Sequence, residues 1–566
     1  MSAASSTSKT GPGTSKQADA TGATPDSPGT ASPESTKILT KPPLLSAAYI
    51  IAGFIFAAIQ GLGLSFIASN LQEIAGPMGL TQNETVWLMA AYVFPNVSLT
   101  LLLFKVRAQY GIRNFSEAAI VVYVFVCLAH LWVNDFGTAL LFRFVAGAAA
   151  APISSLAFLY ILEAFQPARK MNIGLCMALL ALAIPTPLTG ILSPFLLDLG
   201  GVRMFYTFEI GAAMVALGLV YLLPLASPPR VKAIRKLDVV SYIFLAVGLG
   251  SFAVALTVGR LYWWTEANWL AWLFITGIVS SAIFVVIELN RKEHLVDIRW
   301  LTSREILHFA GALLVFRIAL SEQSSGAINF LRNAGMLNAQ MAGLYWVMLI
   351  AAIISGAVCA LIMKPGREPF IHAVALLLLG VGSYMDSQST TLTRPEQMYV
   401  SQALVSFASG LFLPPALAVG MGAAMKRGPN YILSFVVVFL ATQKVGGYLG
   451  SALYGTFVTW REHVHSFYLT SRLQITDPLV TLRLNQLGGA YNKFLTDPGQ
   501  QAVQAKALFA RQVTQQAYAL AYNEAFLLIS CLSFAALGCL LIHVAWQNRQ
   551  RLWSSGISSR SIAQQY

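Results

Sequence analysis

Residues 140–170 read LLFRFVAGAAAAPISSLAFLYILEAFQPARK, and similarly apolar stretches recur along most of the chain. It carries no charged residue between Arg143 and Glu163, so it is long enough to cross a bilayer, which takes about 20 mostly apolar residues. Lipid offers no partner to an open backbone, so the stretch predicts a spanning helix. Of the 566 residues, 56% are hydrophobic and 11% charged, and the mean hydropathy is +0.64. A polytopic membrane protein is therefore predicted, because a soluble chain could not bury so much apolar surface.

Fourteen stretches of this kind predict an all-α membrane protein with 14 transmembrane helices. The first eight spans are predicted at 44–69, 85–104, 115–133, 138–162, 171–196, 204–225, 239–259 and 269–290. The last six are predicted at 307–331, 340–363, 369–385, 398–424, 431–457 and 522–546.

Basic residues gather in the loops that follow the even-numbered spans. These loops hold Lys105, Arg107, Arg113, Arg169, Lys170, Arg230, Lys232, Arg235, Lys236, Arg291, Lys292, Arg299, Arg304, Lys364, Arg367, Lys426 and Arg427. The opposite short loops hold Arg203, Arg260, Arg332 and Arg394. Basic residues near helix ends resist translocation, so both termini are predicted to be cytoplasmic. The net charge of +13 follows from this topology and from contact with anionic lipid heads in the bilayer, and no nucleic-acid partner is expected.

Three segments lie outside the predicted spans. Residues 1–43 are rich in Ser, Thr, Ala, Gly and Pro and are expected to be a disordered cytoplasmic tail. Residues 547–566 are expected to be a second cytoplasmic tail. Residues 458–521 form the one long structured loop, and its end from Gln500 to Ala521 has the apolar spacing of an amphipathic helix. Under the predicted orientation this hairpin is extracytoplasmic, and it is either a simple cap or a docking surface for a periplasmic partner.

Ionisable side chains inside the membrane are costly and usually mark a pathway or a pair. The predicted spans contain Arg143, Glu209, Arg317, Glu322 and Lys444. A structural ion pair, or a side chain that reaches the membrane surface, is an equally good interpretation for Glu209 and Arg317. Arg143 and Lys444 lie deeper in their spans, which favours a role in a cavity.

Backbone breakers and small residues indicate where helices bend or approach closely. Proline removes a helix hydrogen bond, so prolines inside spans predict kinks around a central cavity. Small residues let helices pack closely and slide. The predicted hinge positions are Gly147, Pro185, Pro187, Pro194, Pro414 and Pro415.

Sparse polar residues on otherwise apolar spans predict the lining of a substrate cavity. They are Gln60, Asn96, Tyr160, Gln323, Asn329, Gln402 and Gln443. Such a lining suits an amphipathic organic molecule, and the basic groups tilt the expectation toward a neutral or anionic compound. The chain has no metal-ligand spacing, nucleophile elbow or phosphate-binding glycine loop, so neither an enzyme nor a metal site is predicted.

Several motifs in order resemble the 14-helix drug:proton antiporter branch of the major facilitator superfamily, the EmrB/QacA type. The segment 140–170 resembles the fourth helix of that family, with Arg143 and Gly147 in place. Residues 237–259 and 284–306 resemble its seventh helix and the exit of its eighth, with Asp238, Glu288 and Asp297 in position. The segments 446–469 and 510–528 resemble its closing helix, hairpin and helix.

The resemblance implies a major facilitator fold in a bacterial inner membrane. Two six-helix bundles are expected at 44–225 and 307–546, with two extra helices and linkers at 226–306. The resemblance also implies a proton gradient as the energy source, no cofactor, and work with a periplasmic adaptor and an outer-membrane channel. The hairpin 458–521 is where that contact is expected.

The chain departs from the family at acidic positions. Gly63 stands where the first helix of the family usually carries Asp, and Ala108 replaces an Asp in the loop after the second helix. The fifth-helix signature is blurred to PLTGILSP, and Gln443 takes the place of an Arg, with Lys444 after it. The remaining acids for proton coupling are Glu322, the preferred one, and Glu209.

A transporter that exports amphipathic organic compounds, such as drugs, toxic aromatic acids or metabolites, by proton antiport is the predicted function. Uptake or facilitated diffusion of an organic metabolite is the alternative. A second alternative is a membrane sensor or scaffold that transports nothing, which the missing acids keep open.

Overall fold

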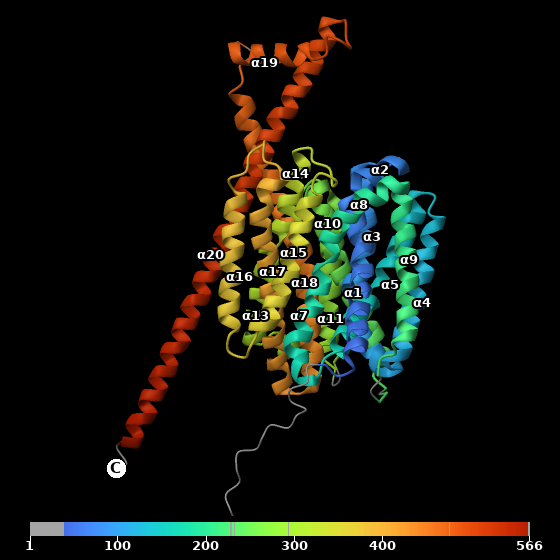
Figure 1. Cartoon of the computed structure of the whole chain (residues 1–566), viewed down its shortest axis with the longest axis vertical. Helices are drawn as coiled ribbons and strands as arrows, with labels where there is room; N and C mark the ends of the chain where they lie inside the picture. Colours follow the sequence, from blue (N-terminus) through green and yellow to red (C-terminus); the bar gives the residue numbers. More distant parts are fainter. Residues whose placement is uncertain (1–38, 227–228, 231, 292–293, 475, 564–566) are drawn as a thin grey trace, which may run out of the picture. The chain divides into compact units, whose positions relative to one another are not determined.

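The computed structural model describes residues 39–563 except 227–228, 231, 292–293 and 475. Of the tail predicted to be disordered at 1–43, residues 1–38 lie outside the described residues, whereas 39–43 are described and lead from the bridge at Leu39 into α1. The described chain is helical, and its isolated bridge between Leu39 and Phe165 is the one strand-like pairing found there. The all-α prediction is therefore confirmed (Figure 1).

The helices follow the predicted spans closely. The first part of the chain contains α1 (Pro43–Ser69), α2 (Leu71–Met78), α3 (Gln82–Tyr110), α4 (Ile112–Ala129), α5 (Phe136–Glu163), α6 (Pro167–Arg169), η3 (Lys170–Gly174), α7 (Leu175–Ala183), α8 (Pro185–Gly200) and α9 (Val202–Leu222). The middle contains α10 (Lys236–Tyr262), α11 (Asn268–Leu289) and α12 (Ile298–Leu301). The last part contains α13 (Arg304–Ala319), η4 (Glu322–Ala327), α14 (Ile328–Asn333), α15 (Ala342–Ile362), α16 (Glu368–Asp386), α17 (Tyr399–Arg427), α18 (Pro429–Ser471), α19 (Pro478–Gly489) and α20 (Pro498–Ala563). Short 3-10 turns at His130–Trp132 and Pro395–Met398 extend α4 and precede α17.

In the described part of the chain, 13 helices are long and apolar enough to cross a membrane. They match every predicted span except the one at 431–457, which lies in α18, where several side chains fall outside the description. The multi-span membrane class is confirmed, and the count of fourteen stays a prediction.

Buried apolar side chains form two large clusters. One draws on α1, α3, α4, α5 and α9, and the other on α12 to α18 and α20. Residues of α7 belong to both clusters. The two extra helices pack together, and α10 also packs against α3 and α18. The division into bundles at 44–225 and 307–546 remains our proposal.

The fifth predicted span is broken where its first proline stands. Helix α7 ends at Ala183 and α8 begins at Pro185, which has no N–H to continue the helix ladder. Pro194 lies inside α8, and Pro414 and Pro415 lie inside the continuous α17. Neighbouring packing therefore tolerates these prolines, and their part in motion stays a prediction.

The loop predicted at 458–521 is built mostly from the ends of two very long helices. Helix α18 has 43 residues and α20 has 66, far more than a bilayer needs. Figure 1 shows both running past the neighbouring helices toward α19. Arg461 of α18 is paired with Glu524 of α20, which braces the base of the hairpin. The helix expected from 500 to 521 is part of α20.

Candidate functional site

Two acidic side chains meet inside the last part of the fold. Glu322 opens the π-helical turn η4, and Asp386 is the last residue of α16. The side-chain amide of Gln402, on α17, donates to both: its Nε2 lies 2.8 Å from Glu322 Oε1 and 2.7 Å from Asp386 Oδ2. All three are buried, with exposures of 0% to 2%. Sequence analysis missed Asp386, because the predicted eleventh span ends one residue before it.

This acid pair, Glu322 and Asp386, has no counter-charge among the described residues. Neither carboxyl group is in an ion pair within the described residues. Ser401 donates a further hydrogen bond to Asp386, while Glu322 Oε2 and Gln402 Oε1 have no partner in the described part of the chain. Burying two unpaired negative charges side by side is very costly, so the pair is stable only when it holds a proton. The arrangement can therefore bind and release protons.

The backbone at the acid pair departs from regular α-helix. Residues Glu322–Ala327 form a π-turn between α13 and α14, and such turns are frequent at functional sites. Gly326 in this turn lies so close to Tyr454 that an added Cβ would be 2.7 Å from the Tyr454 hydroxyl. Next to Glu322, Gln323 Nε2 donates to Ser406 Oγ at 2.6 Å. The turn thus ties span nine to both α17 and α18.

A second charged site lies between α1, α3, α5 and α9. Arg143 is 2% exposed and donates through Nη2 to the carbonyl oxygen of Gly63, and its guanidinium carbon is 4.9 Å from the centre of the Tyr92 ring. Glu209 of α9 is also buried and close enough to interact electrostatically with Arg143. A Cβ on Gly63 would lie 3.1 Å from Glu209 Oε1, so the carboxyl group fills the space that a side chain at residue 63 would take.

A third site joins α18 to α3 and α13. Lys444 Nζ lies 2.8 Å from the Asn96 carbonyl oxygen, 2.9 Å from Asn96 Oδ1 and 3.2 Å from Thr100 Oγ1. One residue earlier, the Gln443 carbonyl oxygen accepts from Arg317 Nε at 3.2 Å. The five ionisable residues predicted from the sequence therefore fall into three separate groups.

The predicted cavity residues occupy different environments. Gln60, Gln323, Asn329 and Gln443 are half-buried, whereas Asn96, Tyr160 and Gln402 are buried. Tyr160 lies in an aromatic cluster with Tyr49 and Phe56, whose ring centres are 5.7 and 4.8 Å away. Their role in substrate binding stays a prediction.

Gly147 allows α3 and α5 to touch. A Cβ at residue 147 would lie 1.9 Å from the Tyr92 carbonyl oxygen, so no other residue fits without moving a backbone. Asn96 Nδ2 donates to the Gly147 carbonyl oxygen at 3.0 Å and fixes the same contact. The structure gives Gly147 a packing role, and its part in a hinge stays a prediction.

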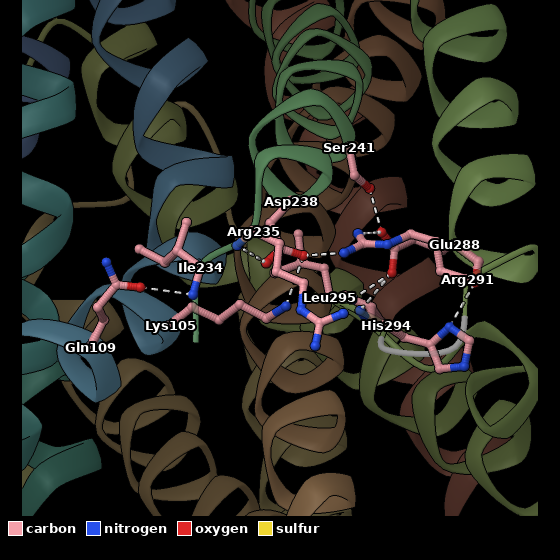
Figure 2. A network of polar contacts seen from close by, with 11 residues as sticks. Lys105, Gln109, Ile234, Arg235, Asp238, Ser241, Glu288, Arg291, His294 and Leu295 are labelled. Carbon is pink, nitrogen blue, oxygen red and sulfur yellow. Dashed lines mark hydrogen bonds and ion pairs between the residues drawn. The ribbon is translucent and has the colours of Figure 1, made fainter. Parts of the chain in front are cut away.

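A network of charges ties the extra helices to α3 (Figure 2). Asp238, the third residue of α10, accepts from Lys105 Nζ at 2.8 Å and from Arg291 Nη2 at 2.5 Å. Arg291 Nη1 also reaches Glu288 Oε1 at 2.9 Å. Burial opposes the charge of Arg291, but its bond to Asp238 and the two carboxylates together raise the pKa of Arg291.

Glu288 holds the chain that leaves α11. It accepts from Ser241 of α10 and from the backbone N–H of Leu295 at 2.6 Å and of Val296 at 3.2 Å. Every oxygen of these buried carboxylates has a partner, which is typical of a structural clamp. We call Lys105, Asp238, Glu288 and Arg291 the clamp.

A polar network also crosses between the two large clusters, near the ends of α1 and α14. Asn70, after α1, accepts from Ser193 of α8 at 2.5 Å and from Asn338 Nδ2 at 3.0 Å. Arg332 Nη2, at the end of α14, donates to the Ser69 carbonyl oxygen at 3.0 Å. These contacts, the Asn70 network, hold the two parts of the fold together at this end.

The helices and their packing define a multi-pass membrane protein with the fold of the major facilitator superfamily. Two solved transporter structures share the fold. The human organic anion transporter MFSD10 (TETRAN) is 11% identical with a TM-score of 0.52, covering 87% of this chain and 100% of that one. The peptide transporter POT in complex with sulfate is 12% identical with a TM-score of 0.53, covering 87% and 94%.

Within that class the chain is similar in sequence to EmrB-type exporters. It is 23% identical to the multidrug export protein EmrB of Escherichia coli (strain K12), over 83% of this chain and 89% of that protein. It is 20% identical to the colistin resistance protein EmrB of Acinetobacter baumannii, over 87% and 95%. No protein-family model matches the chain.

Proposed function

We propose that the chain is a secondary active transporter that exports amphipathic organic compounds by proton antiport. The similarity to multidrug and colistin resistance exporters supports export, and the shared fold supports transport. The observation that carries the proton part is the acid pair Glu322 and Asp386, which shares one amide donor and has no counter-charge in the part of the chain that the structure describes.

In the proposed cycle the first six and last six spans rock about a site between them. A proton drives such a cycle only if its binding favours one conformation. Gln402 of α17 bridges the two acids, so loss of the proton would create repulsion between Glu322 of η4 and Asp386 of α16. That repulsion is relieved if span nine moves, which links proton release to a change of shape.

Proteoliposomes containing the purified chain test the acid pair. We expect a pH gradient to drive flux of an organic dye in the wild type and not in Glu322→Gln or Asp386→Asn. Dye exchange without a gradient should persist in both variants, because exchange needs no proton. Glu396→Gln, an exposed acid before α17, is the matched control and should behave as wild type.

Unchanged gradient-driven flux in both acid variants would show that the acid pair does not couple transport to protons. Loss of exchange together with driven flux would indicate misfolding, so thermal melts of each variant accompany the assay. Direction is read in cells: cells that lack the protein should accumulate more dye if it exports, and less if it takes the compound up.

We also propose that the chain lies in a bacterial inner membrane with both termini in the cytoplasm. The hairpin of α18, α19 and α20 would then be extracytoplasmic. It exposes large apolar side chains, among them Phe467 at 68%, Leu479 at 73% and Phe494 at 81%. Exposed apolar groups of this kind mark interaction surfaces, which supports docking of a periplasmic adaptor that leads to an outer-membrane channel.

Deletion of residues 470–510 tests the docking proposal. We expect the shortened protein to insert and to transport in proteoliposomes, but to give cells no resistance across the outer membrane. Full resistance in cells with the deletion would discard the adaptor contact, and the hairpin would then be a simple cap.

A further inference from the structure

Among the described residues, Lys444 is a cation held only by neutral oxygens. Its three contacts are the two oxygens of Asn96 and the hydroxyl of Thr100, all on α3. Lys105 and Arg291 in the clamp, by contrast, each contact a buried carboxylate. In the part of the chain that the structure describes, Lys444 is in no ion pair.

A second cation lies against the same turn of α18. Arg317 of α13 donates to the carbonyl oxygen of Gln443 and packs on Gly446 and Gly447. A Cβ on Gly447 would lie 2.9 Å from Arg317 Nη2, so the glycine makes room for the guanidinium. No described acid forms an ion pair with Arg317 either.

Both cations are half-buried within predicted spans, as is Gln443 between them. The Gln443 amide nitrogen is buried and has no hydrogen-bond partner among the described residues. A charge that is partly shielded from water is stabilised by a nearby opposite charge. An unpaired amide donor is stabilised by a hydrogen-bond acceptor. Anionic and acceptor groups at this turn of α18 would supply what each of these side chains lacks.

Apolar side chains lie directly beside this turn. Val445 and Tyr448 of α18 pack against Val93 and Val97 of α3 and against Ala253 of α10. A ligand here would meet donors for an anionic head and an apolar surface for a ring or chain. The chemical class that fits is an amphipathic organic anion, such as an aromatic carboxylate or sulfonate.

We infer that Lys444, Arg317 and Gln443 form a binding site for the anionic group of a transported organic compound. For transport, though not for binding, the inference rests on the proposed function. Lys444 contacts Asn96 and Thr100 across the boundary between the first and last six spans. An anion that takes its N–H groups competes with these oxygens, so binding would loosen the contact of α3 with α18.

Binding of two matched dyes tests the site. 1-Anilinonaphthalene-8-sulfonate is an aromatic anion, and N-phenyl-1-naphthylamine has the same rings without the sulfonate. Both are titrated by fluorescence against the full chain in lipid nanodiscs, with empty nanodiscs subtracted. We expect Lys444→Met and Arg317→Met each to weaken sulfonate binding about ten-fold or more, as expected for a lost charged hydrogen bond, and to leave binding of the neutral dye within about two-fold.

Two further variants sharpen the result. Lys444→Arg keeps the charge and should retain most of the sulfonate affinity. Lys426→Met removes an exposed lysine at the end of α17 and should change neither dye. Retained binding of the neutral dye shows that a variant is folded.

Equal affinity for the sulfonate in wild type and Lys444→Met would overturn the inference. So would an equal loss of both dyes in that variant. Sulfonate-selective binding without any flux in proteoliposomes would support the site and defeat the proposed transport function. Flux that is the same with and without the sulfonate group, and the same in Lys444→Met, would support transport and rule out the proposed site.

Discussion

Moving the carboxyl group of Glu209 onto α1 tests what the Arg143 site requires. A Cβ on Gly63 would lie 3.1 Å from Glu209 Oε1, and Arg143 donates to the backbone of the same residue. Aspartate at residue 63 would therefore place its carboxyl group close to where the group of Glu209 lies. Glu209→Gln leaves the buried Arg143 without its neighbouring acid, so we expect that variant to be destabilised and to lose transport, and the double variant Gly63→Asp with Glu209→Gln to keep it.

The single variant Gly63→Asp gives the size of the electrostatic effect on stability. It brings two carboxyl groups into contact, and two unit charges about 4 Å apart repel by about 4 kcal/mol at an effective dielectric constant of about 20. Protonation of one acid removes that repulsion, so the variant should be destabilised by up to about 4 kcal/mol at alkaline pH and by less at acid pH. The double variant carries one acid, as the wild type does, and should melt near the wild type at both.

Proteoliposome flux and thermal melts in detergent measure these effects together. Gly76→Asp in the Glu209→Gln background is the control, since Gly76 is exposed with open space around it and an acid there should rescue nothing. A double variant no more active than Glu209→Gln would refute the idea that an acid at residue 63 can replace Glu209. Full activity of Glu209→Gln would show that the site needs no acid.

Three other changes follow from the packing. Asp238→Asn should lower the free energy of unfolding by about 3–5 kcal/mol, measured by denaturation in detergent, because Lys105 and Arg291 would lose a buried counter-charge; an unchanged midpoint would contradict the clamp. Asn338→Ala should weaken the Asn70 network and open that end of the fold. Distances between spin labels on either side of the network should then show an added population at longer distance. Unchanged distances would show that the network does not hold the two parts of the fold together. Gly147→Val should abolish folded protein on size-exclusion chromatography, since even one added carbon would lie 1.9 Å from a carbonyl oxygen of α3; a normal yield would show that α3 and α5 can separate.

The spans were predictable because hydropathy and lipid thickness act on each stretch separately. Helices such as α1 and α16 begin and end within a residue or two of the predicted limits. The same reasoning could not give the lengths of α18 and α20. Hydropathy reports only the part of a helix that lies in lipid, and these helices continue beyond it into the hairpin.

One of the two residues of the acid pair was predictable from the sequence. Glu322 stood out as an acid within an apolar span, whereas Asp386 fell just past the predicted end of its own span. Their meeting could not be read from the sequence, because 64 residues separate them and no periodicity relates α16 to η4. A usable signal was present in the serines on either side, Ser383 and Ser387, which make the end of α16 more polar than a helix end facing lipid.

Which face of a span points inward was the least predictable feature. A membrane helix that is apolar all round gives little pattern to show its buried side. Tyr160 illustrates this, because its ring packs with Tyr49 and Phe56 in a cluster that sequence spacing does not reveal. The charged residues were found from their cost in lipid, while their partners depended on tertiary packing.

Span nine connects the two sites on which the proposals rest. Arg317 and Glu322 are five residues apart, a spacing that does not put two side chains on one helix face and corresponds to about 7.5 Å along the axis. Arg317 accordingly contacts α18, while Glu322 contacts Gln402 of α17. When α13 and the turn η4 move together, a shift of span nine that relieves an unprotonated acid pair also moves Arg317 against the turn that carries Lys444. Proton release at the acid pair and anion binding at Lys444 would then act on the same span, which gives a physical route for exchanging a proton for an organic anion across the membrane.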